Sequence, residues 1–308
     1  MLVRGVDWSS GRPFLRGAEG ESSLEPGTTL RFRVLDGRRH CLGFSRIEIS
    51  VKNSSGPAAP APGPTSAQQI PCPQGALAER GYQCGSCFSR DDFRFMHDFH
   101  RSGTAPEGLR IYLSQPHWLY IASFANGASK VGTASQLRKA IRLSEQGAVA
   151  AQYVAHADDG RIVRILEDSV SEGLGLAQLV RSANKLGSLT EAWSFDAVSR
   201  ANRELADQVR EYLSAITIDG FRVVQQDWQL PAPSAAFLPG PSDSAPQSYP
   251  LPLDSGEHGL PITAVLGSFA LLELEGQRFV AHLGELKGKL IELGDFSSEL
   301  PALQNSLF

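Results

Sequence analysis

The chain has 308 residues, of which 42% are hydrophobic and 20% are charged, and its formal net charge is −4. A chain of this length can bury a large core in two or three compact units, and its acidic balance argues against a strongly basic nucleic-acid binder, so that any such site must be a local basic patch. The sequence begins without a charged-then-apolar signal pattern and contains no apolar run long enough to span a bilayer, from which we expect a cytoplasmic protein with no membrane contact.

The first 52 residues contain two segments, 29–34 and 47–51, in which apolar and polar residues alternate. A period of two is typical of strands with one buried face. The turn dipeptides Pro26-Gly27 and Asp36-Gly37 flank the first segment. Residues 1–52 are therefore predicted to form a small antiparallel β-unit.

Residues 53–71 are rich in Pro, Ala, Ser and Gly and contain almost no apolar side chain that could join a core. This composition is typical of a spacer, and we predict a mobile loop. A Pro-rich segment that binds a partner is the alternative interpretation.

The four cysteines of the chain are close together in sequence: Cys41, Cys72, Cys84 and Cys87. The C-x-x-C spacing of Cys84 and Cys87 allows two thiolates to bind one tetrahedral ion, and the other two cysteines would complete a four-sulfur set. We predict a structural Zn²⁺ in a segment that spans residues 72–110. A closed site of this kind has no open position for water, so this zinc would perform no chemistry.

Several other readings of these cysteines remain open. They are buried free thiols, a disulfide or a redox C-x-x-C, although a disulfide does not suit a reducing cytosol. A redox motif would open a helix beside a βαβ pattern, whereas polar residues follow Cys87. His97 and His100 form an H-x-x-H pair that could replace a cysteine ligand.

The central part of the chain, residues 111–188, has the clearest order of predicted elements. Two runs of β-forming residues, 118–124 and 129–132, are joined by an Asn-Gly turn and predict a hairpin. A helix is expected from its N-cap Ser135 to Gly147, followed by a strand at 148–155. A second helix, capped within residues 158–160, is expected to end near Gly173.

This order resembles the GIY-YIG domain, a fold known for nicking DNA. Leu119-Tyr120-Ile121 and Lys130-Val131-Gly132 are similar to its paired tripeptides, and Gln146-Gly147-Ala148 and a later Leu-Glu add to the likeness. The whole pattern is also similar to an uncharacterised bacterial domain family in which such a core follows a cysteine cluster. The resemblance implies a three-stranded sheet with flanking helices. It also implies that Arg138 or Arg142 matches the family's arginine and that Glu167 matches its metal-binding glutamate.

Tyr120 and Lys130 are the candidate catalytic residues of the hairpin. A tyrosine beside a metal-bound phosphate could orient or deprotonate a water, but Tyr120 also fits a core position. Lys130 stands where the nuclease pattern has a tyrosine. Its ammonium group suits a phosphate contact, and it acts as a base only if burial lowers its pKa.

Arg138 and Arg142 are four residues apart, so both are expected on one side of the first helix, where they form a basic patch with Lys130 and Lys139. The alternative is a solvated helix face. Glu167 is predicted at the half-buried border of the apolar stripe of the second helix, whereas Arg164 is predicted to point nearly away. Glu167 could therefore hold Mg²⁺ or Mn²⁺, or it could form an ion pair with Arg142 or a helix partner.

The rest of the chain is divided by composition. Residues 189–230 are predicted to be a helical section, residues 231–261 a Pro/Ser-rich loop, and residues 262–308 a C-terminal β-unit that packs with the N-terminal one. The predicted fold class is thus α+β, with a GIY-YIG-like core and a small antiparallel β-unit formed from both chain ends beside the four-cysteine zinc site.

Three functions remain open at this point. The first is DNA or RNA binding through a local basic patch with metal-dependent phosphodiester cleavage, in which Tyr120 or Lys130 handles the proton, Arg142 neutralises the phosphorane and Glu167 holds the metal ion. The second is a non-catalytic nucleic-acid or protein adaptor. The third is an enzyme, such as a transferase, that uses the same cleft for a small anionic substrate or a charged tRNA.

Overall fold

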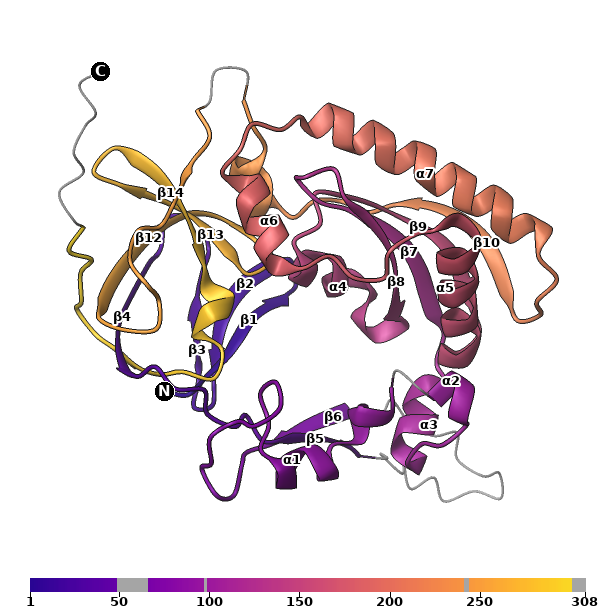
Figure 1. The fold of residues 1–308 in the computed structure, drawn as a ribbon, viewed down its shortest axis with the longest axis horizontal. Helices are drawn as coiled ribbons and strands as arrows, with labels where there is room; N and C mark the ends of the chain where they lie inside the picture. The colour runs from indigo at the N-terminus through magenta and orange to yellow at the C-terminus, as the bar shows by residue number, and fades with distance from the viewer. Residues whose placement is uncertain (49–65, 97–98, 241–243, 301–308) are drawn as a thin grey trace.

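The computed structural model describes residues 1–48, 66–96, 99–240 and 244–300. These residues form an α+β fold with several sheets and helices, as the sequence predicts (Figure 1). The strands are β1 (Val3–Ser9), β2 (Arg12–Gly17), β3 (Glu21–Ser23), β4 (Thr29–Asp36), β5 (Phe44–Glu48), β6 (Ser66–Ile70), β7 (His117–Ser123), β8 (Ser129–Ser135), β9 (Ala150–Ala157), β10 (Phe221–Asp227), β11 (Gln247–Ser248), β12 (Glu257–Leu266), β13 (Phe269–Leu274), β14 (Gln277–His282) and β15 (Leu290–Leu293).

Helices are concentrated in the middle of the chain. The α-helices are α1 (Gly85–Arg90), α2 (Phe99–Ser102), α3 (Glu107–Leu113), α4 (Lys139–Gln146), α5 (Gly160–Leu174), α6 (Ser182–Leu189) and α7 (Phe195–Ala215). Short 3-10 helices are η1 (Asp92–Phe95), η2 (Gln136–Arg138), η3 (Ala232–Phe237) and η4 (Leu283–Leu286).

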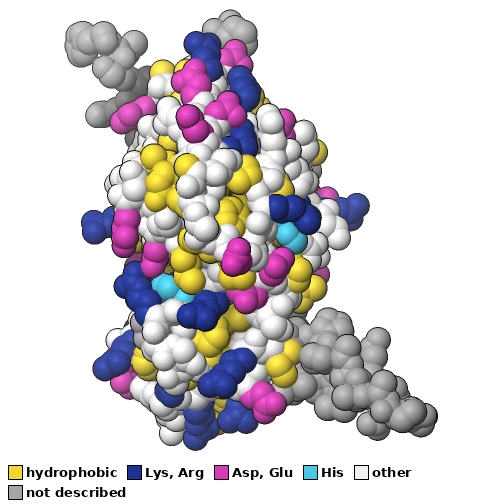
Figure 2. Space-filling view, turned by 90° about the vertical axis from the view of Figure 1, so that its right-hand side faces the viewer, with side chains coloured by type: hydrophobic (Ala, Val, Ile, Leu, Met, Phe, Trp, Pro, Cys, Tyr) yellow, Lys and Arg dark blue, Asp and Glu magenta, His cyan; other side chains and the backbone are white. Residues whose placement is uncertain are grey.

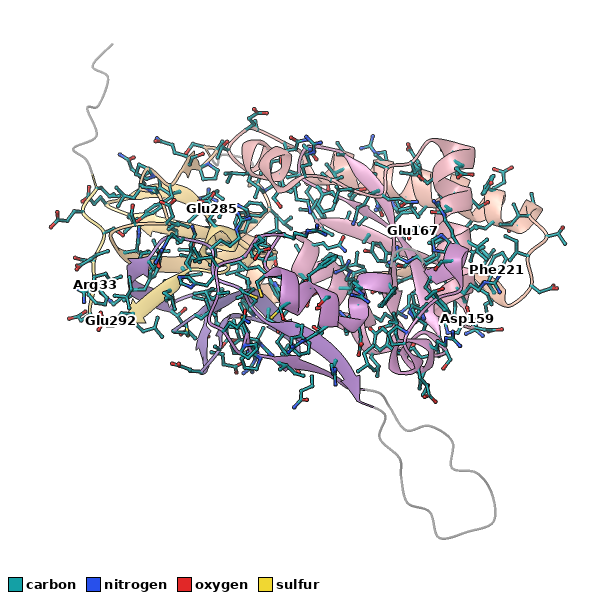
Figure 3. The ribbon with its side chains drawn as sticks, turned by 60° about the horizontal axis from the view of Figure 1, so that its bottom comes forward. Arg33, Asp159, Glu167, Phe221, Glu285 and Glu292 are labelled. Atoms are coloured by element: carbon teal, nitrogen blue, oxygen red, sulfur yellow. The ribbon has the colours of Figure 1, made fainter. Side chains whose placement is uncertain are left out.

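Both halves of the chain contribute to one β-unit. A six-stranded sheet has the order β11-β14-β13-β12-β4-β15, so β4 from the first 40 residues lies between strands from the last 60. Arg33 of β4 pairs with Glu292 of β15 at 2.6 Å, at the left edge of Figure 3. A separate three-stranded sheet, β1-β2-β3, packs against it through a shared apolar core that includes Trp8, Leu15 and Phe32.

The cysteine-containing segment lies below the two larger units in Figure 1. It is built on the β5–β6 hairpin with the short helices α1 to α3 beside it. The prediction of a loop over 53–71 is therefore wrong for residues 66–70, which form β6, while residues 53–65 lie outside the described ranges. Main-chain pairing with β5, from Phe44 opposite Ile70 onward, makes this polar stretch a strand.

The central sheet has four antiparallel strands in the order β10-β9-β7-β8. The expected sheet of three strands has a fourth, β10, which lies within the section predicted as helical and pairs antiparallel with β9. Its first residue, Phe221, lies near Asp159 at the right of Figure 3. Helices α5 and α7 cover one face of this sheet with an apolar layer, and α4 lies toward the other face (Figure 1).

The segment 231–261 is not a continuous loop. It contains η3 and β11, and β12 begins at Glu257, where pairing with β4 buries His258. Pro261 lies inside β12, opposite Thr29 of β4. Among the described residues, no helix is both long and apolar enough to cross a membrane.

Candidate functional site

The four cysteines converge on one point. Their Sγ atoms all lie within 4.8 Å of one another, and Cys41, Cys84 and Cys87 are buried while Cys72 is half-buried. Cys84 and Cys87 lie at the start of α1, Cys41 follows β4 and Cys72 follows β6. The tetrad can therefore hold a metal ion.

The donor set fits a tetrahedral metal. Zn–S bonds of about 2.3 Å in a tetrahedron require sulfurs roughly 3.8 Å apart, and Cys72 Sγ lies 3.9 Å from Cys84 Sγ. The main-chain N–H groups of Cys84 and Gly43 donate to Cys41 Sγ at 3.1 and 3.4 Å. Gly43 has φ +84°, and a Cβ there would lie 1.9 Å from Ile70 O, so this turn requires glycine.

The alternatives for the cysteines are resolved in part. All four cysteines are described, and none forms a disulfide. His100 lies on α2 with its Nε2 3.0 Å from Asp168 Oδ2 of α5, so it is not part of the cysteine cluster. His97 lies outside the described ranges.

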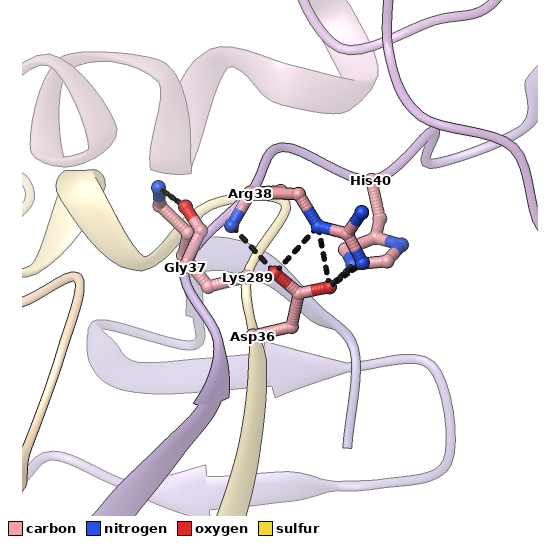
Figure 4. A network of polar contacts seen from close by, with 5 residues as sticks. All are labelled: Asp36, Gly37, Arg38, His40 and Lys289. Carbon is pink, nitrogen blue, oxygen red and sulfur yellow. Dashed lines mark hydrogen bonds and ion pairs between the residues drawn. The ribbon is translucent and has the colours of Figure 1, made fainter.

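A polar network holds the chain where it passes from β4 to Cys41 (Figure 4). Asp36 accepts hydrogen bonds from the main-chain N–H of Arg38 at 2.9 Å and from its guanidinium at 2.6 and 3.0 Å, and lies 3.0 Å from His40 Nε2. The Arg38 side chain holds the pKa of Asp36 well below its usual range. Lys289 also donates to Gly37 O, which joins β15 to the same turn.

In the central hairpin, the two tripeptides pair directly. Tyr120 lies opposite Gly132 on the neighbouring strand, and the Tyr120 side chain is 1% exposed. A Cβ at Gly132 would lie 2.6 Å from Tyr120 Oη, so glycine provides the space for the ring. The Tyr120 hydroxyl accepts a hydrogen bond from Gln146 Nε2 at 2.8 Å, and burial raises the pKa of Tyr120.

Lys130 is buried beside Tyr120, with 8% of the residue exposed. Burial, and next the charge of Arg142, lower the pKa of Lys130 to about 8, and Glu167 acts in the opposite direction. Within the described ranges, no side chain or main-chain group pairs with its ammonium. Lys185 of α6 lies nearby, donates to Gln146 O at 2.7 Å, and has a pKa lowered to about 8 by burial and by Lys130.

Glu167 is fully buried rather than half-buried, at 4% exposure, and it forms an ion pair with Arg164. Arg164 was expected to point nearly away from the apolar stripe, but it pairs with Glu167, since residues three apart are neighbours on a helix. The alternative of an ion pair between Glu167 and a partner on its helix is therefore confirmed. Burial raises the pKa of Glu167, and Arg164 and Lys130 oppose this effect. The carboxylate is therefore already neutralised from within its own helix.

A cavity of about 1050 Å³ lies where the β-unit, the cysteine segment and the central sheet meet. Its wall includes residues of β1, β6, η1 and β8 as well as the starts of β7 and α5. Six basic side chains and two carboxylates line it, an excess of four positive charges in a chain whose net charge is −4. The basic residues are Arg4, Arg16, Arg138, Arg142, Arg164 and Lys287.

The structure divides the predicted site residues into two groups. Arg138 and Arg142 line the cavity, on η2 and α4 rather than on one continuous helix. Tyr120, Lys130 and Glu167 do not line it but are buried near Arg142, which acts electrostatically on the first two. Lys139, which was expected in the basic patch, does not line the cavity; its Nζ lies 3.1 Å from the centroid of the Trp118 ring.

Sequence reasoning missed four of the basic lining residues and one histidine. Arg4, Arg16 and Lys287 come from the two ends of the chain, and Arg164 was placed on the wrong side of its helix. His117, the first residue of β7, also lines the cavity and is 5% exposed. Its position at the start of a strong apolar run, directly after Pro116, was the available signal.

Comparison with protein-family models, with curated proteins and with solved structures finds no match for this chain.

Proposed function

We propose that this protein binds the phosphate backbone of a nucleic acid, DNA or RNA, in the basic cavity. The observation that carries the proposal is the concentration of six cations on one concave wall of a chain that is acidic as a whole. Arginine forms bidentate hydrogen bonds with phosphate, and a concave site of one sign of charge concentrates the opposite charge. A polyanion is the ligand that this wall suits best.

The cations of the wall differ in how far they are already neutralised. Arg16 pairs with Asp7 at 2.9 Å, Arg138 pairs with Glu145, and Arg164 pairs with Glu167. Arg4 and Arg142 form no ion pair with any described residue. These two arginines supply the charge that a ligand would meet first.

The size of the cavity points to a short segment of the ligand. The volume of about 1050 Å³ lies at the upper end of the range of ligand pockets, roughly 300–1,000 Å³. We infer that a single-stranded end of a few nucleotides enters the cavity. Lys and Arg side chains also gather toward the lower end of the face shown in Figure 2.

The test measures the binding of labelled single-stranded DNA, single-stranded RNA and duplex DNA by fluorescence anisotropy at several salt concentrations. The double variant Arg4→Gln/Arg142→Gln should weaken binding at least about tenfold and lower the salt slope by about 2, one unit for each lost phosphate contact. Arg203→Gln, an exposed arginine of α7, is the matched control and should leave both unchanged. No binding at low salt, or equal binding by the double variant, would refute the proposal.

Metal-dependent cleavage by a GIY-YIG-like core is a second candidate. It is supported by the order hairpin, helix, strand, helix, by Tyr120 opposite Gly132, and by the electrostatic proximity of Lys130 to Arg142 and Glu167. For Mg²⁺ or Mn²⁺ to bind, Glu167 would have to exchange Arg164 for the metal ion. Because this exchange costs a buried ion pair, the geometry favours binding over cleavage by this route.

The adaptor hypothesis and the small-substrate hypothesis lead to different outcomes of the same measurements. An adaptor binds oligonucleotides and shows no turnover with added Mg²⁺ or Mn²⁺. An enzyme for a small anionic substrate would bind inorganic phosphate or a mononucleotide as tightly as an oligonucleotide. The buried pairing of Glu167 with Arg164 and the lysine at position 130 support the adaptor over the metal-dependent nuclease.

For the cysteine tetrad we propose a structural Zn²⁺. Four sulfur ligands at these separations satisfy a tetrahedral ion and leave no position for water. The ion would connect the end of β4, the end of β6 and the start of α1, and would thereby fix the segment that forms one wall of the cavity.

A further inference from the structure

His117 lies at the corner of the cavity where β7, β8 and α5 meet. Across the sheet it pairs with Ser135 of β8 and with Ala157 of β9. Its ring lies against Gly160, the first residue of α5, where an added Cβ would be 3.2 Å from Nε2. Thr133, Ser135 and Arg164 line the same cavity.

One tautomer of the His117 ring is favoured. Nδ1 lies 2.8 Å from the main-chain carbonyl oxygen of Gln115, which can only accept a hydrogen bond, so Nδ1 carries the proton. Nε2 is left as an acceptor, and none of the described residues forms a hydrogen bond with it. The cavity wall therefore includes a neutral imidazole nitrogen that can accept a hydrogen bond.

The surroundings keep this ring neutral. Burial lowers the pKa of His117 below its ordinary 6.5, and Arg164 of α5 lowers it further, against the opposing effects of Gln115 and Asp159. The N-terminus of α5 also disfavours a positive charge on the ring. An imidazole of this kind can accept a proton at neutral pH.

A phosphodiester itself offers only acceptors to the wall, and an O–H group beside the phosphate can donate to Nε2. Such a group is a water molecule or the 2′-hydroxyl of a ribose. Both become nucleophiles toward phosphorus when they lose a proton. The arginines that bind the phosphate would also stabilise the charge that builds up during the attack.

We propose that His117 is the proton acceptor of a phosphodiester cleavage carried out in this cavity, an inference that rests on the proposed binding of a nucleic acid there. Nε2 takes the proton of the attacking O–H, the new O–P bond forms, and the P–O bond to the leaving oxygen breaks. The imidazolium then returns the proton to the leaving oxygen. With water the products are a phosphate monoester and an alcohol, and with a 2′-hydroxyl they are a 2′,3′-cyclic phosphate and a 5′-hydroxyl.

The experiment uses the full chain with single-stranded RNA and DNA of the same sequence, with and without added Mg²⁺. His117→Asn keeps a donor for Gln115 O and removes the base. His156→Asn, a change at a half-buried histidine of β9 that does not line the cavity, is the matched control. All three proteins are purified in parallel, so that trace nucleases contribute equally to each.

The wild type should cleave, His156→Asn should match it, and His117→Asn should lose about 100-fold or more in rate. Oligonucleotide affinity should stay within about twofold for both variants. The wild-type rate should rise with pH and level off below neutral pH, and this acidic limb should vanish in His117→Asn. Mass spectrometry of the products separates the two nucleophiles, since only attack by the ribose gives a cyclic phosphate and spares DNA.

Two outcomes would overturn the inference while the proposed function stands. They are a wild type that binds oligonucleotides without cleaving them, and a His117→Asn variant that cleaves as fast as the wild type. A wild type that binds no oligonucleotide would refute both.

Discussion

Arg164 and Glu167, three residues apart on α5, form an ion pair in which the glutamate is the buried partner. Glu167 is 4% exposed, whereas Arg164 lines the basic cavity (Figure 3 shows Glu167). The pair thus connects the buried cluster around Lys130 with the cavity wall. The two predicted roles of Glu167, metal ligand and ion-pair partner, compete for the same carboxylate.

Glu167→Gln separates these roles. The loss of the buried charge pair should lower the free energy of unfolding by about 2 kcal/mol, since Arg164 can still be hydrated from the cavity. Because Arg164 then loses its anion, oligonucleotide affinity should increase a few-fold. Urea unfolding and anisotropy measure the two effects, and Glu172→Gln, an exposed change on the same helix, should alter neither. A loss of Mg²⁺-stimulated cleavage without a gain in affinity would favour the metal-ligand role.

Gly132→Ala should destabilise the protein by about 1–3 kcal/mol through overpacking. The added Cβ would lie 2.6 Å from Tyr120 Oη and 2.7 Å from its Cζ, and the ring is buried and bound to Gln146. Gly187→Ala is the contrast, because nothing lies within 4 Å of its Cβ position on an exposed turn of α6. That variant should gain roughly 0.5–1 kcal/mol. Equal thermal unfolding of the two variants would contradict the close approach of Tyr120 to Gly132.

Lys130→Met should stabilise the protein at neutral pH. The pKa of Lys130 falls from 10.5 to about 8, mainly because the ammonium is buried. At roughly 1.4 kcal/mol per unit, the cost of the charge is about 3.5 kcal/mol at most. Between pH 8 and 10.5 the unfolded chain binds more protons than the folded one, so wild-type stability rises with pH there. The advantage of the variant should be full below pH 8 and should fade toward pH 10.5.

The check is urea unfolding of wild type and Lys130→Met across this pH range. Lys139→Met should instead lower the free energy of unfolding at neutral pH. The Lys139 ammonium lies over the Trp118 ring and donates to Gln226 Oε1 at 2.7 Å, and the variant loses both contacts. A Lys130→Met variant less stable than the wild type at pH 7 would show that the buried ammonium has a favourable partner.

Local chemistry was readable from the sequence. Asp159 accepts hydrogen bonds from the main-chain N–H groups of Arg161 and Ile162, as its place before α5 predicts, and Gly147 ends α4 in the left-handed conformation. Ser135 precedes the helical region as expected, but its hydroxyl pairs with Tyr112 instead of capping the helix. Helix boundaries that depend on a few neighbouring residues could therefore largely be predicted from the sequence.

Contacts between distant segments were not readable. The sequence of β6 is too polar to predict a strand, and the strand forms because β5 pairs with it. Strand β10 joins the central sheet by pairing with β9, which lies more than 60 residues earlier in the chain. The basic cavity collects Arg4, Arg142 and Lys287 from three parts of the chain. Arg164, by contrast, was misplaced although its spacing of three residues from Glu167 already made the two neighbours on one helix.

The cysteine tetrad gives the last prediction: the purified chain should carry one zinc ion, measurable by elemental analysis. Cys87→Ser should lose it, because three sulfurs cannot close the tetrahedral site, whereas Ser86→Ala, in the same C-x-x-C, should retain it. Without metal, four buried or half-buried thiols have no common partner, and the segment from β5 to α3 should become sensitive to limited proteolysis. Oligonucleotide affinity should fall with it, because this segment forms part of the cavity wall. Zinc content that persists in Cys87→Ser, or a metal-free protein that resists protease as well as the wild type, would remove the structural role of the tetrad.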